Sequence, residues 1–548
     1  MLLQICCGQL LARPTTIQEA EKAATGWLET DTKPLDTAIG RQVIRVETFT
    51  DDNDEPIYYI AYLQPSGFVI VSADDLVEPI IGFSSTSTFD PSSRNPLGAL
   101  VIRDMKSRLA EAKTKTALQS EIRTFTASKS QNKWGHYVSR AETSGGRITS
   151  SSSSSISDIR VAPLIQSKWS QLDVCNHNCY NYYTPNHYPA GCVATAIAQF
   201  TRYYQYPTTG IGIHDFKIKI NGSQQSAYTL GGDGDGGAYN WNDMVLVPNC
   251  TTSNIQLQAI GTLCYDAGIA TNTEYGPEGS SADAFSAAEA LITTFKYTNA
   301  VKGFNQGDDI GSGLTGMINP NLDYGNPVIL GIWRTQNGHA VICDGYGYNS
   351  STLYHHLNMG WSGNDDAWYN LPKVDAKTVY TSIIACMYNI FTSGTGEIIS
   401  GLVTDTSGKP IFGAKVTARG SRLKYEAITN KKGIYAIAKV PSEETYTISI
   451  IKTGYLFTDR IVTTGVSNDG ENISGNMWQI DFVGSIAGDL DGDNDVDIND
   501  FVIFTSSWLT KSEDAAWNPA CDISTPADNF INAIDFAVFF NNWQQGVK

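Results

Sequence analysis

The sequence predicts an α+β protein of several domains, and three features of the chain lead to that prediction. Its 548 residues are too many for one hydrophobic core, which indicates three to four domains. Helical and strand patterns are mixed between residues 15 and 391, whereas residues 398–484 show short strand patterns between turns. The final stretch, residues 485–548, contains an internal helical repeat.

The composition argues against two classes of function. The net charge is −18 and no block rich in lysine and arginine occurs, which argues against nucleic-acid binding. No run of 18 apolar residues exists, so no membrane-spanning helix is expected. Residues 1–14 begin with a short apolar stretch that lacks a basic segment before it. Either the remnant of a signal peptide or an ordinary irregular start explains this stretch.

Residues 15–125 predict a first compact α+β domain. Thr16 and Glu19 have the spacing of a capping box, which begins a helix that runs through Leu28. A two-stranded hairpin and a second helix are expected over residues 57–63, 68–72 and 97–113. Residues 126–160 lose this periodicity and contain a serine run, which predicts a flexible linker open to proteases. Ordered structure is expected again over residues 161–393.

Cys192 is predicted to lie in the first turn of a helix. The apolar residues after it share one helical face, which ends at Pro207: Val193, Ile197, Phe200 and Tyr204. The partial positive charge at a helix N-terminus favours the thiolate, which is the reactive form of cysteine. The competing interpretation of such a free cysteine is a small buried hydrophobic residue.

His339 is predicted to begin a strand, after the strand over residues 328–332 and the turn at Asn337-Gly338. A thiol nucleophile needs a base, and that base comes from a distant part of the chain in many such enzymes. Cys192 and His339 fit this pairing, although a single histidine in such a place is often structural. Asn358 is suited to orient the imidazole, and Trp361 to shield that bond from water. Gln171 is suited to donate to a developing oxyanion.

Cys175, Cys179 and His187 allow three interpretations. The first is a zinc site, because two cysteines and a nearby histidine supply three of the four ligands that zinc requires, but no fourth ligand is evident. The second is a disulfide within the loop, and the third is a pair of plain thiols.

Several segments between residues 161 and 391 resemble, in order, the streptopain family of secreted bacterial cysteine peptidases, whose fold is papain-like. They are Trp169-Ser170-Gln171, residues 191–199 with 204–207, Tyr239-Asn240-Trp241, residues 266–269, Tyr275-Gly276-Pro277 and Gly338-His339-Ala340. Residues 58–88, with Tyr62, residues 67–75 and residues 81–84, resemble the inhibitory prodomain of that family. The expected fold is therefore a papain-like α+β peptidase domain preceded by an α+β prodomain.

The resemblance also implies roles for individual residues. Cys192 would be the nucleophile, and His339 the general base and acid. Gln171 would contact the oxyanion, while Asn358 and Trp361 would support the histidine. Gly338 and Ser280 would line the substrate cleft. One position departs from the family, because Met359 stands where the family has tryptophan, which would reduce the aromatic cover over the dyad.

An acidic loop near the C-terminus has the spacing of a calcium site. Its carboxylates fall at positions 1, 3, 5, 7, 9 and 12 of a twelve-residue loop: Asp489, Asp491, Asp493, Asp495, Asp497 and Asp500. Asn494 replaces the usual glycine at position 6 and tolerates a left-handed backbone. Val496 is expected to anchor the loop to the core, and Asp500 to begin a helix. A solvated acidic run is the competing interpretation.

A second copy follows 35 residues later, from Asp500-Phe501 to Asp535-Phe536. Its ligands fit if about two residues are inserted near Pro526: Asp522, Ser524, Asp528, Asn532 and Asp535. The pair of loops resembles a dockerin-type module, which in its family binds a cohesin. Residues 398–484 resemble a carboxypeptidase-regulatory-like β-sandwich, a common spacer.

These expectations combine into a secreted cysteine endopeptidase made as a zymogen. Its activation cleavage would fall in the linker over residues 126–160, and residues 485–548 would bind structural calcium and a cohesin-like partner on a scaffold or cell surface. Catalysis would need no cofactor. One rival hypothesis is a catalytically retired surface binding protein with the same fold. A second is an enzyme that uses the dyad for acyl transfer to an amine or for hydrolysis of cell-wall amides.

Overall fold

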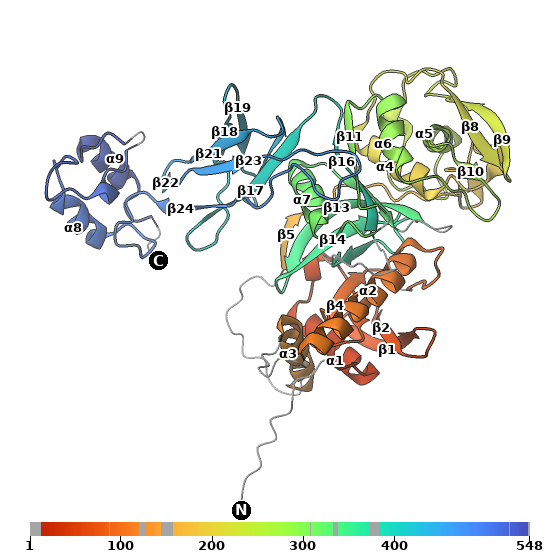
Figure 1. Cartoon of the computed structure of the whole chain (residues 1–548), viewed down its shortest axis with the longest axis horizontal. Helices are drawn as coiled ribbons and strands as arrows, with labels where there is room; N and C mark the ends of the chain where they lie inside the picture. Colours follow the sequence, from red (N-terminus) through yellow and green to blue (C-terminus); the bar gives the residue numbers. More distant parts are fainter. Residues whose placement is uncertain are drawn as a thin grey trace, which may run out of the picture. The chain divides into compact units, whose positions relative to one another are not determined.

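The computed structural model of the chain describes residues 13–86, 88–119, 128–143, 157–306, 308–332, 338–371, 383–524 and 527–545 (Figure 1). The first twelve residues of the signal remnant predicted over residues 1–14 lie outside these residues, as do the serine run, Asn337 and Pro526. The chain forms two compact units. The first contains residues up to Thr395 together with Asn468–Ser474, and the second contains residues 396–467 and 475–548.

The N-terminal region has the helices and the hairpin that its sequence predicts. Thr16 and Glu19 form the capping box, which supports the first helix. The elements are α1 (Ile17–Thr30), β1 (Gln42–Thr50), β2 (Pro56–Gln64), β3 (Phe68–Ser72), β4 (Ile80–Ser84) and α2 (Pro96–Gln119). Trp27 and Phe83 are buried in the core between α1 and the strands, with ring centroids 5.0 Å apart.

One prediction for the linker is wrong, because residues 129–143 form a third helix, α3 (Lys129–Thr143). It packs on α1 through two buried aromatic residues, Trp134 and Tyr137. Burial of each ring contributes roughly 2–3 kcal/mol to such packing. The Trp134 indole donates to the carbonyl of Val77 at 3.1 Å. Few apolar residues occur in this helix, so tertiary packing rather than a strong apolar stripe stabilises it.

A single antiparallel sheet runs from the N-terminal region into the central region. Its strand order is β1-β2-β3-β4-β15-β14-β13-β12-β16-β11, and β5 (Ser157–Val161) pairs with β13. The central strands are β11 (Asn299–Phe304), β12 (Val328–Ile332), β13 (His339–Asn349), β14 (Thr352–Asn358), β15 (Ala367–Tyr369) and β16 (Ile383–Phe391). The pairing of β4 with β15 makes the two regions share one sheet.

The remaining part of the central region is mainly helical. Figure 1 shows α4, α5 and α6 grouped with β8, β9 and β10. Their bounds, with those of α7 and the short hairpin β6–β7, are β6 (Asp173–Val174), β7 (His177–Asn178), α4 (Cys192–Tyr204), β8 (Asp215–Ile220), β9 (Ser223–Tyr228), α5 (Asn254–Ala270), β10 (Glu274–Tyr275), α6 (Ser286–Thr293) and α7 (Leu314–Tyr324). The predicted apolar face of α4 is buried at Val193, Ile197 and Phe200.

The second unit contains two four-stranded sheets, ordered β20-β17-β24-β22 and β19-β18-β21-β23, with a shared core between them. Their bounds are β17 (Glu397–Asp405), β18 (Lys415–Arg419), β19 (Lys424–Ile428), β20 (Ile434–Val440), β21 (Thr445–Ile451), β22 (Tyr455–Leu456), β23 (Arg460–Thr463) and β24 (Phe482–Ile486). Asn468–Ser474 lies instead against β11 of the first unit, where the Gly470 amide donates to the Lys302 carbonyl at 2.8 Å.

The predicted repeat forms two helices, α8 (Ile498–Ser506) and α9 (Ala533–Asn541). They contact each other through equivalent aromatic residues, and the rings of Phe504 and Phe539 stack with centroids 5.1 Å apart. Among the described residues, the chain contains no helix with both the length and the apolar character needed to cross a membrane.

Candidate active site

Cys192 is the first residue of α4, as its sequence predicts. Gly191 precedes it with φ of +93°, a conformation that other residues rarely adopt. A Cβ atom on Gly191 would lie 3.2 Å from the carbonyl oxygen of Ser280, so the close approach of this loop also favours glycine. The thiol is therefore held at a helix N-terminus beside the loop that contains Ser280.

His339 is the first residue of β13 and pairs with Ile332 of β12. Burial alone would raise the pKa of the Cys192 thiol, but a hydrogen bond to His339 and the charge of its ring lower that pKa below the ordinary value. Amides of Ala340 and Val193 act in the same direction. Burial likewise lowers the pKa of His339, but its contacts with Cys192 raise it above the ordinary value. The two residues thus favour a thiolate–imidazolium pair.

This coupling predicts how the thiol titrates. In the chain freed of its N-terminal region, alkylation of Cys192 by iodoacetamide should rise with pH below the ordinary cysteine pKa of about 8.5. Peptide hydrolysis should rise in the same range, then fall when the imidazolium loses its proton, above the ordinary histidine pKa of about 6.5. His339→Ala should move the alkylation profile up toward the ordinary thiol value. Identical profiles for the two proteins would contradict the coupling.

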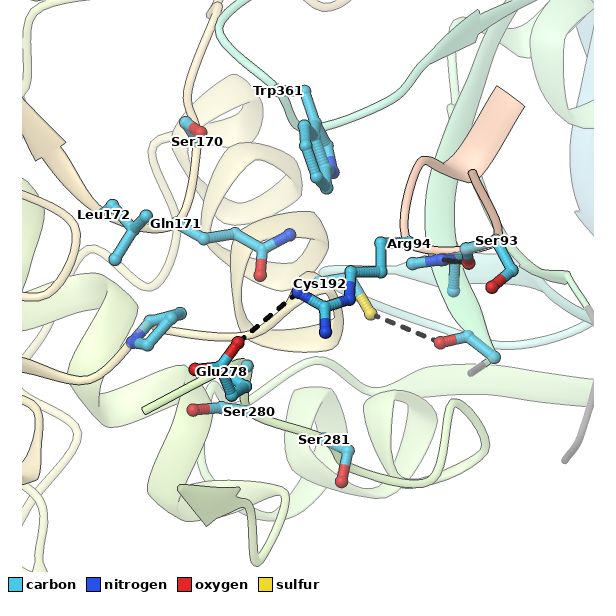
Figure 2. A pocket seen from close by; sticks show the side chains of 14 residues that line it. Ser93, Arg94, Ser170, Gln171, Leu172, Cys192, Glu278, Ser280, Ser281 and Trp361 are labelled. Carbon is cyan, nitrogen blue, oxygen red and sulfur yellow. Dashed lines mark hydrogen bonds and ion pairs between the residues drawn. The ribbon is translucent and has the colours of Figure 1, made fainter. Parts of the chain in front are cut away.

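Six of the seven residues predicted for catalysis and substrate binding line one cleft, which has a volume of about 490 Å³. They are Gln171, Cys192, Ser280, Gly338, His339 and Trp361. Figure 2 shows the side chains of Gln171, Cys192 and Trp361 directed into the same space. The Cys192 sulfur lies 3.9 Å from the Gly338 carbonyl oxygen. Ser280 Oγ and Trp361 Nε1 are buried and have no hydrogen-bond partner within the described parts of the chain.

Asn358, the seventh, is not among the residues that line the cleft. It is buried, and its amide nitrogen donates to the Ser167 carbonyl at 3.1 Å. Its amide oxygen accepts from Gln199 and from the Gly360 amide, both at 3.0 Å. These contacts fix the chain beside α4, where Asn358 pairs with Ile342 of β13, three residues along the strand from His339. The role of Asn358 in orienting His339 stays a prediction.

Gln199 supports the site although its sequence position does not mark it as a site residue. It lies two turns after Cys192 on α4 and is 1% exposed. Its amide oxygen accepts from Ser167 Oγ at 2.9 Å and from the Trp169 amide at 3.1 Å. Gln199 therefore positions the segment that contains Gln171. A buried polar residue on an otherwise apolar helical face is the signal that predicts such a role.

The N-terminal region reaches into the cleft through the loop before α2. His339 Nε2 donates to the carbonyl oxygen of Ser93 at 3.0 Å, and Ser93 and Arg94 line the cleft. Asn95 donates to Asp365 at 2.5 Å. The histidine nitrogen that would face an orienting group is thus bound to the N-terminal region, and no sequence signal in this loop predicts that contact.

A buried ion pair also anchors α2 to the central region. Asp104 is fully buried and accepts from Arg108 at 2.9 Å and from the hydroxyl of Tyr369 at 2.6 Å. Arg108 donates in addition to the side chain of Asn370 at 2.9 Å. Tyr369 and Asn370 lie at the end of β15, the strand that pairs with β4. The N-terminal region is therefore held by a sheet ladder and by a buried polar network.

Cys175 forms a disulfide with Cys250, with Cα atoms 5.3 Å apart. This excludes both zinc binding by Cys175 and a disulfide within its own loop. Cys179 is a buried free thiol, and burial raises its pKa to about 12. His187 contacts the Asn181 carbonyl through its Nδ1 atom at 3.1 Å. The disulfide joins the loop after Gln171 to the segment before α5.

The acidic loops of the second unit have the predicted backbone. Asn494 has φ of +72°, Val496 is fully buried, and Asp497 caps α8. Donor atoms of three sets of carboxylates lie within 4.8 Å of one another: Asp489, Asp491 and Asp493; Asp495, Asp497 and Asp500; and Asp522, Asp528 and Asp535. The backbone amides of Ser524 and Asn532 donate to Asp535 of the third set, at 2.8 and 2.9 Å.

Three regions of the chain match known families. Residues 169–369 match the Peptidase C10 family, residues 12–109 match the Spi protease inhibitor family, and residues 398–473 match the carboxypeptidase regulatory-like domain. Streptopain of Streptococcus pyogenes serotype M1 is 26% identical over 350 residues, which cover 61% of this chain and 79% of streptopain. The thiol protease/hemagglutinin PrtT of Porphyromonas gingivalis is 24% identical over 390 residues, or 68% of this chain and 40% of that protein.

Among solved structures, prointerpain A of Prevotella intermedia aligns with a TM-score of 0.42 and 20% identity, over 64% of this chain and 98% of that one. The family matches confirm the streptopain-like peptidase, the inhibitory prodomain and the regulatory-like β-domain that the sequence predicts, while the dockerin-type module stays a prediction. Residues 169–369 are thus similar to the Peptidase C10 family and follow a region similar to the Spi protease inhibitor, and these similarities identify the chain as a cysteine peptidase.

Proposed function

We propose that the chain is the zymogen of a cysteine endopeptidase that uses Cys192 as nucleophile and His339 as base. One observation carries this proposal. A thiol with a lowered pKa and its histidine share a cleft that the N-terminal region enters through Ser93 and Arg94. Peptide substrates cannot use the cleft until that region leaves. The residues before about 130–160 would be removed for activation.

The chemistry follows from the positions of these groups. The Cys192 thiolate attacks the peptide carbonyl carbon, and the oxyanion accepts hydrogen bonds from the Gln171 amide and the amide at the start of α4. As the carbon–nitrogen bond breaks, the His339 imidazolium gives its proton to the leaving amine. His339 then removes a proton from water, which hydrolyses the acyl-enzyme and releases the thiolate. Trp361 covers one side of the cleft.

The weaker hypothesis is that the chain is a surface binding protein that keeps the fold but has lost catalytic activity. Its support in the sequence is Met359, but this side chain is buried and is not among the residues that line the cleft. Acyl transfer uses the same dyad and would show as incorporation of a labelled amine into a peptide. The prodomain contacts favour hydrolysis of proteins, because a domain of the protease-inhibitor type is the part that enters the cleft.

Casein hydrolysis tests this function directly. Full-length protein in reductant is incubated until its N-terminal region is lost, with a second protease added if it does not convert by itself. We expect peptides to be released from casein, and we expect iodoacetamide to stop their release. Amine incorporation without hydrolysis would assign the dyad to acyl transfer. If the protein neither hydrolyses casein nor incorporates an amine after conversion, the catalytically retired binding protein would be favoured.

We also propose that residues 485–548 bind calcium in a dockerin-type module. Asp489, Asp491 and Asp495 have raised pKa values, because burial and the surrounding carboxylates both oppose their charge. One oxygen of Asp495 is buried and has no hydrogen-bond partner among the described residues. A divalent cation held by the loop over residues 489–500 would relieve both effects, and Asp522, Ser524, Asp528, Asn532 and Asp535 would form the second site.

Calcium binding makes a separate prediction. Calcium chloride should release or absorb heat in a titration of the full-length protein and should raise the unfolding temperature of the second unit. Asp491→Ala should weaken binding by about tenfold or more, since it removes one charged ligand. Asp459→Ala, which removes the same charge from a site outside the loops, should not. Equal affinities for the two variants would contradict the assignment.

The helices of this module also support a docking role. Several of their large apolar side chains are exposed, between 58 and 64%: Ile498, Val502, Ile534 and Phe540. Exposed apolar side chains of this size on two adjacent helices are typical of a binding surface. A cohesin-like protein on a scaffold or cell surface is the partner that we propose. Export of the chain is supported by the Cys175–Cys250 disulfide, since such bonds persist outside the cytosol.

A further inference from the structure

Ser93 and Asn95 fix the ends of a short segment in the cleft. The carbonyl of Ser93 accepts from His339, and the side chain of Asn95 donates to Asp365. Asn95 is 2% exposed, and its amide oxygen accepts from the amides of the first turn of α2. The residue between them, Arg94, is therefore presented to the cleft from a backbone that is held on both sides.

Arg94 meets a carboxylate on the opposite wall. Its Nη1 atom lies 3.4 Å from an oxygen of Glu278, and Figure 2 shows this contact crossing the cleft beside Cys192. Glu278 belongs to the loop whose Ser280 carbonyl oxygen is packed against Gly191, directly before the nucleophile. A side chain that contacts Glu278 thus belongs to a peptide that passes close to the reacting thiol.

Glu278 differs in charge from the residues around it. Among the described residues that the central region contributes to the cleft, it is the one carboxylate, and apart from the dyad the others are neutral: Ser170, Gln171, Leu172, Pro189, Gly279, Ser280, Ser281, Gly338 and Trp361. When the N-terminal region leaves, Arg94 leaves with it. Glu278 then faces the cleft without the guanidinium that it contacts in the zymogen.

We propose that Glu278 selects substrates that place an arginine or lysine side chain beside it, in the position that Arg94 takes in the zymogen. This inference rests on the proposed peptidase function and names a specificity residue for it. A basic side chain of the substrate would restore the ion pair, whereas an acidic one would be repelled by the like charge. In the zymogen, Arg94 would then occupy the part of the cleft that receives a basic side chain of the substrate.

The expected preference is moderate. The side chains of Arg94 and Glu278 are 73 and 82% exposed, so water screens their attraction. An exposed ion pair changes an equilibrium by up to about fivefold, and a peptide lying over the pair would exclude part of that water. We therefore expect kcat/KM to be about fivefold higher for a basic side chain than for a neutral side chain of the same shape.

Paired peptides that differ in one charge test this proposal. Citrulline has the shape of arginine without its charge, so peptides with arginine or citrulline at each position around a cleaved bond isolate the ion pair. The enzyme is the full-length chain after conversion. At one position the arginine peptide should be cleaved about fivefold faster, and Glu278→Gln should reduce that ratio to about one. Glu278→Arg should instead favour a glutamate peptide at the same position.

Glu274→Gln is the matched control, because it removes a carboxylate four residues away that pairs with Lys219 and does not line the cleft. Its arginine-to-citrulline ratio should stay near five. A ratio of one at every position for the unaltered enzyme would overturn the proposal and leave the peptidase function standing. An arginine-to-citrulline ratio near five in Glu278→Gln would also overturn the proposal. Failure of the converted enzyme to cleave both peptides and casein would instead refute the peptidase function itself.

Discussion

Replacing Cys192 by alanine is expected to lower peptide hydrolysis by a factor of roughly 10⁴ to 10⁶, because it removes the thiol that forms the acyl-enzyme. If conversion is carried out by the chain itself, the variant should also keep its N-terminal region through a gel time course in reductant and calcium. The rate of peptide hydrolysis is measured on casein after a second protease has removed the N-terminal region. The same protein should unfold at a temperature close to that of the unaltered chain, because Cys192 is only partly buried.

Cys521→Ala is the control for this variant. Cys521 is another free cysteine, but it belongs to the helical repeat of the second unit. Its loss should leave hydrolysis at the level of the unaltered protein. If Cys192→Ala still cleaved casein, or if both variants lost activity equally, the nucleophile would have to be sought elsewhere.

Replacing Arg108 by alanine is expected to loosen the N-terminal region from the peptidase domain. The change leaves the carboxyl group of Asp104 buried beside Tyr369 without the cation that compensates it. Removal of one partner from a buried ion pair lowers the free energy of unfolding by about 3–5 kcal/mol. Protonation of Asp104 would reduce this loss. Burial already raises the pKa of Asp104, so that protonation is favoured. The zymogen should therefore unfold at a lower temperature, and added trypsin should remove its N-terminal region faster.

The measurement is made in a Cys192→Ala background, so that self-cleavage cannot obscure it. Thermal unfolding and the rate of cutting by added trypsin report how firmly the N-terminal region is held. Lys113→Ala is the matched control, because it removes a cation from the same helix that pairs with Glu55 at the surface. An exposed pair contributes less than about 1 kcal/mol. Equal effects of the two changes would show that the buried network does not hold the prodomain.

Much of the site can be predicted from the sequence, because each signal is local. A cysteine at the start of an apolar helical pattern and a histidine at the start of a strand are properties of short segments, and the structure places Cys192 and His339 together. The capping box at Thr16 and the left-handed Asn494 are local in the same sense. Such features depend on backbone preferences that neighbouring residues set.

The features that the sequence does not predict are contacts between distant segments. The place of Asn358 in the chain suggests a contact with His339, but the pairing of β14 with β13 directs it to Gln199. The sequence does not predict the helix α3, because the stability of this helix depends on the packing of Trp134 against α1. Cys175 pairs with Cys250 across a separation of 75 residues, which no spacing rule predicts. The contact between Ser93 and His339 likewise depends on where the whole prodomain lies.

The most direct test of the zymogen mechanism is the position of a covalent label. Full-length and converted protein are treated with a peptidyl chloromethyl ketone, and the modified cysteine is identified by mass spectrometry of the digested chain. We expect one label, on Cys192, that forms rapidly only after the N-terminal region is lost and that is absent from Cys192→Ala. A label on Cys192 at the same rate in the zymogen would contradict the closed cleft, and a label on any other cysteine would contradict the assignment of the nucleophile.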